Sequence, residues 1–185
     1  MSMSTDNPLW LTFDLEMNQP SNKIIQIGAC IGNIHTGEIL KEYSFFINPG
    51  EQITPYITQL TGVTQEMVES SPHSVESAWM AIEPDLRSLN VNYSPITWGG
   101  GDLRTLRQQL PERTAEQLPY RIGRREMDVK TLVQFRAIYQ NKHLQGGLAK
   151  QMVRDGLHFK GTKHDALDDA KNTFWYAVYL ARVFR

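Results

Sequence analysis

The sequence is nearly without cysteine. Its 185 residues contain one, Cys30, which lies in the apolar run IIQIGACIG and has no partner for a disulfide. A disulfide scaffold and a zinc site built from cysteine and histidine clusters are therefore excluded. We expect Cys30 to be a buried, unreactive side chain. A single thiol favours a reducing compartment, and we expect a cytoplasmic protein.

Long apolar runs and a strong charge bias are also lacking. No run approaches the ~20 residues that cross a bilayer, and the start, MSMSTDNP, has neither the basic nor the apolar part of a signal peptide. We expect no membrane association. Lys and Arg number 19 and Asp and Glu 20, for a net charge of -1. A strongly basic nucleic-acid scaffold is not indicated, whereas an enzyme acting on a strand end needs only local basic groups and metal ions.

The order of segments predicts an α/β protein. An apolar fraction of 41% favours one domain over residues 1–185, with a flexible N-terminus at 1–8. The turn sequences NIHTG and NPG separate β-like segments, which indicates an antiparallel meander followed by alternating helices and strands. We predict a mixed five-stranded sheet flanked by helices, with strands at 9–16, 24–34, 39–47, 95–98 and 120–129. We predict helices at 53–62, 64–72, 74–89 (kinked or divided at Pro84), 102–110, 130–141, 147–155 and 166–184.

Two acids end the first predicted strand, in TFDLEMNQP. Asp14 and Glu16 are two residues apart, so both side chains lie on one face of the sheet. Like charges held that close repel, and a divalent cation or a shared proton between them offsets the repulsion. The alternative is an exposed strand end with two solvated carboxylates.

Further acids and a histidine share this setting. Three glycines in SPITWGGGD allow a sharp turn that presents Asp102, and HDALDDA at the start of the last helix supplies another acid. Oxygen ligands without cysteine point to Mg²⁺ or Mn²⁺, and two such ions favour phosphodiester cleavage. His164 is the candidate to take a proton from the attacking water. Asp102 could instead cap a helix, and His164 could be a surface residue.

These segments resemble motifs of the DEDDh family of 3′-to-5′ exonucleases. FDLEMN with IIQIGA resembles the first family motif, TWGGGDLRTL the second and HDALDDAKNT the third. INPGEQITPYITQLTGVTQEMV also resembles the segment after the third strand. Four such segments occur in the family's order, from about Leu9 to the last helix. Together they are a specific signal for the family, whereas one D-x-E pair alone would be weak evidence. The motif forms are most similar to the RNA-directed branch, which includes histone-mRNA 3′ exonuclease and oligoribonuclease.

The resemblance implies a ribonuclease H-like fold and two Mg²⁺ or Mn²⁺ ions. By the match, Asp14 would bridge both ions, Glu16 and Asp169 would bind the ion that activates water, and Asp102 would help to hold the second. His164 would be the general base. The family form of the third motif, histidine, four residues, aspartate, selects Asp169 over Asp165 and Asp168, a choice that helical periodicity leaves open.

The resemblance also implies contacts with the terminal nucleotide. The matching positions are Met17, Asn18, Leu60, Thr61 and Val63, with core packing as the alternative for Leu60 and Val63. The glycine run Gly99 to Gly101 occupies the place where relatives often carry an aromatic or polar residue before the second-motif acid, which is a departure from the family pattern that concerns local substrate contacts and not the metal ligands. Basic residues near the motifs could contact phosphates or form a solvated face: Arg121, Arg124, Arg125, Lys130, Lys160 and Lys163.

Taken together, the sequence predicts a metal-dependent 3′-to-5′ exonuclease that removes nucleoside 5′-monophosphates from single-stranded RNA or DNA. The alternatives are a non-catalytic nucleic-acid-binding module of the same fold, or a small-nucleotide phosphodiesterase or endonuclease. A protein partner or a homodimer is left open by the sequence.

Overall fold

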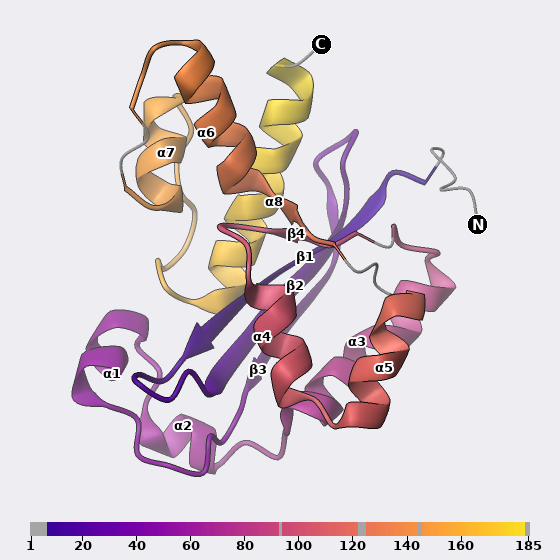
Figure 1. Cartoon of the computed structure of the whole chain (residues 1–185), viewed down its shortest axis with the longest axis vertical. Coiled ribbons are helices and arrows are strands. Elements are labelled where there is room, and N and C mark those ends of the chain that lie inside the picture. Colours follow the sequence, from indigo (N-terminus) through magenta and orange to yellow (C-terminus); the bar gives the residue numbers. More distant parts are fainter. Residues whose placement is uncertain (1–6, 93, 122–124, 144–145, 184–185) are drawn as a thin grey trace.

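The fold is built on a sheet of five strands (Figure 1). In this computed structural model the described residues are 7–92, 94–121, 125–143 and 146–183. The strand order is β3-β2-β1-β4-β5; β1 is antiparallel to β2, and β2 to β3, while β4 is parallel to both β1 and β5. The predicted mixed sheet is therefore confirmed. The strands are β1 (Leu9–Met17), β2 (Ile24–Asn33), β3 (Ile39–Phe46), β4 (Ile96–Thr97) and β5 (Met127–Asp128).

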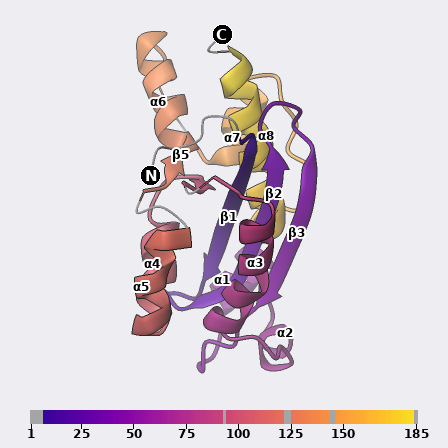
Figure 2. The same ribbon diagram turned by 90° about the vertical axis from the view of Figure 1, so that its right-hand side faces the viewer.

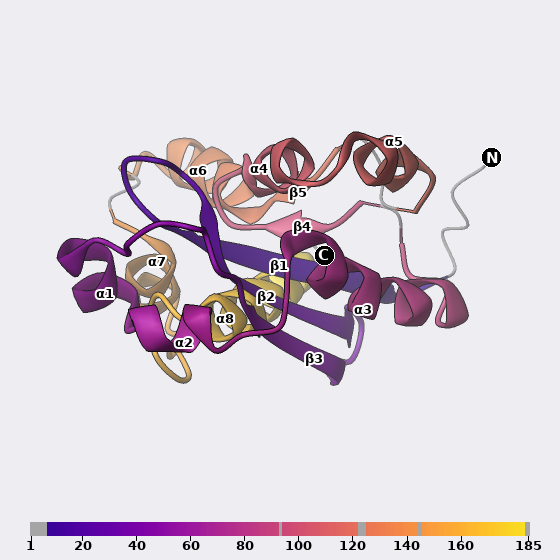
Figure 3. The ribbon, with the colours of Figure 1, turned by 90° about the horizontal axis from the view of Figure 1, so that it is seen from below.

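Helices cover both faces of this sheet, with α4 and α5 on the β4 side and β3 at the far edge (Figure 2). Seen from below, α4, α5 and α6 form a row along the β4–β5 edge (Figure 3). The helices are α1 (Pro55–Thr61), α2 (Gln65–Glu69), α3 (Val75–Ser88), α4 (Asp102–Gln109), α5 (Glu112–Arg121), α6 (Val129–Tyr139), α7 (Leu148–Arg154) and α8 (Ala166–Val183).

Two predicted elements differ from the structure. The predicted strand at 120–129 is wrong over most of its described length, because α5 extends to Arg121 and β5 has two residues. Helix α3 is not divided at Pro84 and continues to Ser88. Of the predicted flexible N-terminus, residues 1–6 lie outside the described residues.

Alternation along β1 separates the core from the acids. Leu11, Phe13 and Leu15 pack in one apolar cluster with Trp79 of α3 and Leu106 of α4. The residues between them face the other side of the sheet, where α8 lies. There Cys30, a buried free thiol, packs with Phe174 and Val178 of α8. The strand therefore directs Asp14 and Glu16 towards the start of α8.

Helices α6, α7 and α8 are joined by a polar contact within a second apolar cluster. Asp155, directly after α7, forms an ion pair with Arg136 of α6 and accepts a hydrogen bond at 2.6 Å from the hydroxyl of Tyr176 on α8. Among the helices that the structure describes, none combines the length and apolar character that a bilayer crossing requires.

Candidate active site

The start of α8 lies directly against β2. Gly28 stands opposite Asp14 in the β1–β2 register, and a Cβ atom on Gly28 would lie 2.0 Å from the carbonyl carbon of Ala166. Only glycine, which has no Cβ atom, leaves room for the backbone of α8 at this position of β2. The residue opposite Glu16 is Gln26. These two β2 positions therefore determine how closely α8 approaches the two acids of β1.

Gln26 is buried and bonds to the first turn of α8. Its Nε2 donates to the carboxylate of Asp165 at 2.8 Å, and its Oε1 accepts from the N–H of Ala166 at 3.2 Å. Asp165 also accepts from the N–H of Asp168 at 3.0 Å, and Asp168 accepts from the N–H of Thr162 at 2.8 Å. Both acids are thus engaged in holding the helix start and the loop before it.

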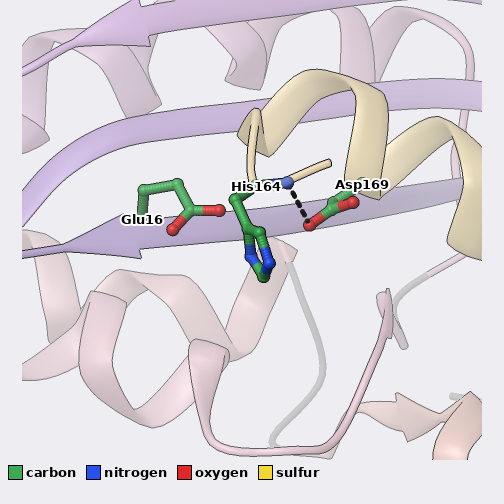
Figure 4. A group of neighbouring side chains, drawn as sticks. All are labelled: Glu16, His164 and Asp169. Atoms are coloured by element: carbon green, nitrogen blue, oxygen red, sulfur yellow. Dashed lines mark hydrogen bonds between the residues drawn. The ribbon is translucent and has the colours of Figure 1, made fainter. Parts of the chain in front are cut away.

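His164 and Asp169 are brought to Glu16 by this docking (Figure 4). Glu16, His164 and Asp169 each offer a ligand atom, and these atoms lie within 4.8 Å of one another. The His164 backbone has a φ of 63°, which is unusual for a residue with a side chain, and its N–H donates to Asp169 Oδ2 at 3.3 Å. The imidazole is left exposed beside a cavity of about 260 Å³ that Lys150 and Lys163 also line.

The fourth acid is presented by the glycine turn. Gly99, Gly100 and Gly101 have φ values of 100°, 62° and 112°, a run that residues with a Cβ rarely adopt. Asp102 then begins α4, and the N-cap Gly101 supplies no side-chain hydrogen bond. Asp102 is therefore the first residue of the helix, and the alternative of a capping aspartate does not hold.

The cap of α4 comes instead from a distant acid, Glu126. Its carboxylate accepts hydrogen bonds from the N–H groups of Gly101 at 2.6 Å and Leu103 at 3.2 Å. Asp128 accepts from the N–H of Gly99 at 2.8 Å and also caps α6. Two carboxylates of the β5 segment thereby fasten both ends of the glycine turn.

Burial and mutual repulsion raise the pKa of each of the four acids. Burial first, then the charges of Asp102 and Asp169, place the pKa of Asp14 well above its usual range. Burial and neighbouring carboxylates raise the pKa of Glu16 to about 8. Burial followed by Glu126 and Asp128 raises the pKa of Asp102 to about 7. Burial raises the pKa of Asp169 to about 6, against a lowering by the His164 N–H.

This donor set fits hard divalent cations. Carboxylate oxygens are the ligands that Mg²⁺ and Mn²⁺ prefer, and a cation among these four acids would relieve the repulsion that disfavours their ionised forms. Asp14 and Glu16 from β1, Asp102 from α4 and Asp169 from α8 come from three elements far apart in sequence. The predicted carboxylate set is brought together with His164 at one place.

The predicted substrate contacts fall into two groups. Leu60 is 37% exposed, and Met17 is partly buried at the end of β1. By contrast, Asn18 is buried and bonds to Glu51, to the carbonyl of Gln52 and to the N–H of Thr54. Thr61 and Val63 are buried as well, with the Thr61 hydroxyl donating to the Ile57 carbonyl and Val63 in an apolar cluster. Val63 therefore packs in the core, and Asn18 and Thr61 are held by internal hydrogen bonds. Substrate contact by these three stays a prediction.

Sequence reasoning missed Gln26, Glu126 and Asp128. A signal existed for the last two, because Glu126 and Asp128 repeat the two-residue spacing of Asp14 and Glu16, with Glu126 directly before β5 and Asp128 at its end. Of the basic residues considered, Lys160 lies 4.4 Å from the ring centroid of Trp175. Arg124 and the side chain of Arg121 lie outside the described parts of the chain.

Fold and site together define a class of protein: an α/β domain that gathers carboxylates for cations where the sheet changes from antiparallel to parallel pairing. A model of the RNase_T exonuclease family matches residues 11–175. ERI1 exoribonuclease 2 of Danio rerio is 25% identical over 183 residues, covering 85% of this chain and 31% of that protein. The 3′-5′ exonuclease Snipper of Drosophila melanogaster is 26% identical over 169 residues, covering 81% and 58%.

The chain belongs to this exonuclease family. The solved nuclease domain of 3′hExo, a DEDDh family member bound to rAMP, superposes with a TM-score of 0.73 at 19% identity, covering 97% of this chain and 94% of that one. That likeness establishes the ribonuclease H-like fold. DEDDh exonucleases are metal-dependent, in keeping with the carboxylate cluster. This chain spans less than two thirds of the length of either relative above.

Proposed function

We propose that this protein is a metal-dependent 3′-to-5′ exonuclease that releases nucleoside 5′-monophosphates from single-stranded 3′ ends. The observation that carries the proposal is the convergence of Asp14, Glu16, Asp102 and Asp169 with His164. A binding module of the same fold needs neither four mutually repelling acids nor a histidine beside them. The names of the two sequence relatives, an exoribonuclease and a 3′-5′ exonuclease, support the same reaction.

Asp14, Glu16, Asp102 and Asp169 would hold two Mg²⁺ or Mn²⁺ ions. When bound, such ions supply Lewis-acid activation of a water molecule and offset negative charge on the leaving oxygen. The chain's own acids provide the anionic field that selects hard cations. Their raised pKa values mean that cation binding and deprotonation of the site occur together.

His164 takes the proton from the attacking water. Its imidazole is exposed and lies beside Glu16 and Asp169 (Figure 4), within reach of a water molecule held at these carboxylates. The water oxygen forms a bond to phosphorus, and the bond from phosphorus to the 3′-oxygen of the preceding nucleotide breaks. That oxygen gains a proton, so the products are a nucleoside 5′-monophosphate and a strand shortened by one nucleotide with a free 3′-hydroxyl.

We infer a single-stranded RNA or DNA substrate from the solved neighbours. One is a 3′-exonuclease that recognises the 3′ end of a histone mRNA stem-loop, and another is E. coli exonuclease I in complex with a dA16 oligonucleotide. The motif forms favour RNA. Cytoplasmic location and assembly with a partner or a second copy stay predictions.

The first test is a time course on 5′-labelled single-stranded RNA and DNA of one sequence, with Mg²⁺, Mn²⁺ or EDTA. We expect a ladder that recedes from the 3′ end with either metal and no cleavage in EDTA. Internal cuts would favour an endonuclease. Inactivity on both polymers with both metals would refute the proposal and favour a binding module or a small-nucleotide enzyme.

A matched pair of variants tests the assignment of the ligands. Asp169→Asn removes a carboxylate that lies beside Glu16 and His164, whereas Asp168→Asn keeps the carbonyl oxygen that accepts from Thr162. We expect Asp169→Asn and Asp14→Ala to abolish hydrolysis and Asp168→Asn to retain most of it. Equal activity of the two Asn variants would contradict the proposed site.

His164→Ala tests the proton transfer. General-base catalysis contributes roughly 10²–10⁴-fold, so we expect kcat to fall by that factor. Mg²⁺ affinity, measured by titration calorimetry, should change little. Parallel losses of rate and Mg²⁺ affinity would assign His164 to ligand positioning instead.

A further inference from the structure

The outer side of α4 carries two adjoining grooves that the carboxylate site does not include. One, of about 520 Å³, is lined by Leu103, Arg104, Arg107, Gln108, Arg125 and Glu126. The other, of about 740 Å³, extends from Arg104 and Gln108 to Met17 and Lys23. Because Arg104 and Gln108 line both, the two grooves meet on α4.

Basic side chains gather in these grooves although the net charge of the chain is -1. Arg104 comes from α4, and Arg125 from the segment before β5. Both are exposed, and within the described residues neither forms an ion pair. Lys23 differs, because it pairs with Glu51 at 3.1 Å and donates to the Pro49 carbonyl.

The acid that lines the first groove does not cancel these charges by pairing with them. Glu126 has its carboxylate occupied by the backbone N–H groups of Gly101 and Leu103. The groove therefore presents two arginine side chains to solvent. Guanidinium groups bind phosphate through several N–H donors, which makes a phosphate-bearing polymer the complementary ligand.

The grooves begin beside the acid cluster. Arg104 is two residues after Asp102 in the first turn of α4, and Met17 directly follows Glu16 at the end of β1. Helix α4 lies in front of that end of β1 (Figure 1). The grooves thus offer a path along α4 to a strand whose 3′-terminal phosphodiester lies at the carboxylates.

We propose that the first groove, through Arg104 and Arg125, binds the phosphates of the substrate strand on the 5′ side of the cleaved nucleotide. The proposal rests on the proposed function, and it adds that the activity depends on the length of the substrate strand. Long strands engage the groove and the carboxylates together, whereas a dinucleotide reaches only the carboxylates. The groove reads the backbone and not the bases, so it contributes little sequence preference.

The test compares wild type with Arg104→Gln/Arg125→Gln on a strand of about 16 nucleotides and on a dinucleotide. Two exposed charge contacts correspond to about a 10-fold effect. We expect the ratio of kcat/KM for the long strand to that for the dinucleotide to fall by this factor. Arg104→Lys/Arg125→Lys, which keeps the charge, should recover most of the ratio.

Direct binding separates this proposal from the exonuclease proposal. Fluorescence anisotropy with the labelled strand, in an Asp14→Asn background, needs no turnover. We expect the two Gln substitutions to weaken binding about 10-fold and to reduce the slope of log Kd against log salt by about 1.4. If the Gln substitutions weaken binding in this way while the protein with Asp14 intact hydrolyses neither RNA nor DNA, the exonuclease proposal is refuted and the groove proposal is kept.

The matched control is Lys142→Gln/Arg182→Gln, which removes two charges near the far ends of α6 and α8. The proposal is overturned if this control weakens binding as much as the groove variant does. It is also overturned if the groove variant binds the long strand with wild-type affinity, or if its kcat/KM falls equally on both substrates. Because Arg104 and Arg125 are exposed, thermal melts should show that all variants remain folded.

Discussion

The two sides of the carboxylate site are held in place by different means. On the α8 side, Asp169 and His164 depend on contact between backbones, where Gly28 lets the helix start lie directly on β2. On the α4 side, Asp102 follows a turn of three glycines that Glu126 and Asp128 hold by hydrogen bonds to backbone N–H groups. Backbone packing together with the Gln26 hydrogen bonds fixes the first side, and carboxylate hydrogen bonds to a glycine turn fix the second.

The difference indicates how each side responds to change. A packed backbone contact tolerates no added atom, because interiors are close-packed and the helix would have to move as a unit. A turn fastened by carboxylates loses stability in proportion to the hydrogen bonds removed. We therefore expect substitutions on the α8 side to abolish the site and those on the α4 side to weaken it.

The largest effect is expected from Gly28→Ala. The new methyl group would lie 2.0 Å from the Ala166 carbonyl carbon and 2.1 Å from the Leu167 nitrogen, so α8 must shift or the protein unfolds. We expect a loss of about 3 kcal/mol or more in the free energy of unfolding, with activity below detection. Urea denaturation and the exonuclease assay measure the two effects.

Gly147→Ala is the control for that experiment. Its φ is -79°, and a Cβ atom there would meet nothing within 4 Å. This variant should retain stability and activity. A Gly28→Ala protein as stable and active as Gly147→Ala would contradict the packing argument.

A smaller effect is expected from Glu126→Ala. The change removes the acceptor for Gly101 and Leu103 at the start of α4, and caps of this kind are worth roughly 0.5–2 kcal/mol. We expect the melting temperature to fall by about 2–8 °C. Because Asp102 is then less well held, the Mg²⁺ concentration for half-maximal activity should rise.

Glu116→Ala, an exposed change on α5, provides the comparison for Glu126→Ala. It should alter neither the melting temperature nor the Mg²⁺ requirement. If Glu126→Ala matches it in both measurements, the glycine turn holds Asp102 without help from β5.

The smallest effect is a pH dependence of stability in the metal-free protein. Burial and neighbouring acids raise the pKa of Glu16 to about 8 in the folded state, so the folded protein binds more protons than the unfolded chain above the ordinary glutamate pKa. Stability therefore falls as the pH rises from about 4.5 towards 8 and then levels off. Solvent screening reduces the expected loss in the free energy of unfolding to about 1 kcal/mol. That loss corresponds to a fall of roughly 2–4 °C in melting temperature.

Melting in EDTA at about pH 5.5 and about pH 8 measures this slope. Mg²⁺ should reduce it, because a bound cation favours the ionised carboxylates. Glu16→Gln should reduce it in EDTA as well. A metal-free protein that becomes more stable towards pH 8 would reverse the sign and contradict the repulsion argument.

Much of the fold was predictable because its patterns are local. The turn sequences NIHTG and NPG and the apolar runs predicted the meander, and β1, β2 and β3 match within one residue at their ends. Helix α5 was missed because ERTAEQLPYR is mostly polar and contains a proline, so few apolar residues mark a buried face. Strand β5 has two residues, too few to produce a periodicity.

The site was predictable where spacing carries the information, as for Asp14 and Glu16 on one face of a strand. The supporting residues were not predictable in the same way. Gln26 acts on Ala166 and Glu126 acts on Gly101, so their partners are distant in sequence and are set by the packing of helices on the sheet. A polar residue in an apolar run, such as Gln26, is the clue that sequence alone offers.

The shortness of β4 determines where Asp102 lies relative to the acids of β1. Strand β4 has two residues, and its Ile96 pairs with Thr12 of β1. Within the described residues, β1 from Phe13 to Met17 therefore has no neighbouring strand on that edge. The chain after β4 turns through the three glycines to Asp102, whose charge acts on Asp14. An insertion that lengthened β4 by about three residues would carry Asp102 roughly 10 Å along the sheet and away from Asp14, so the carboxylates would be separated while every proposed ligand stayed in the chain.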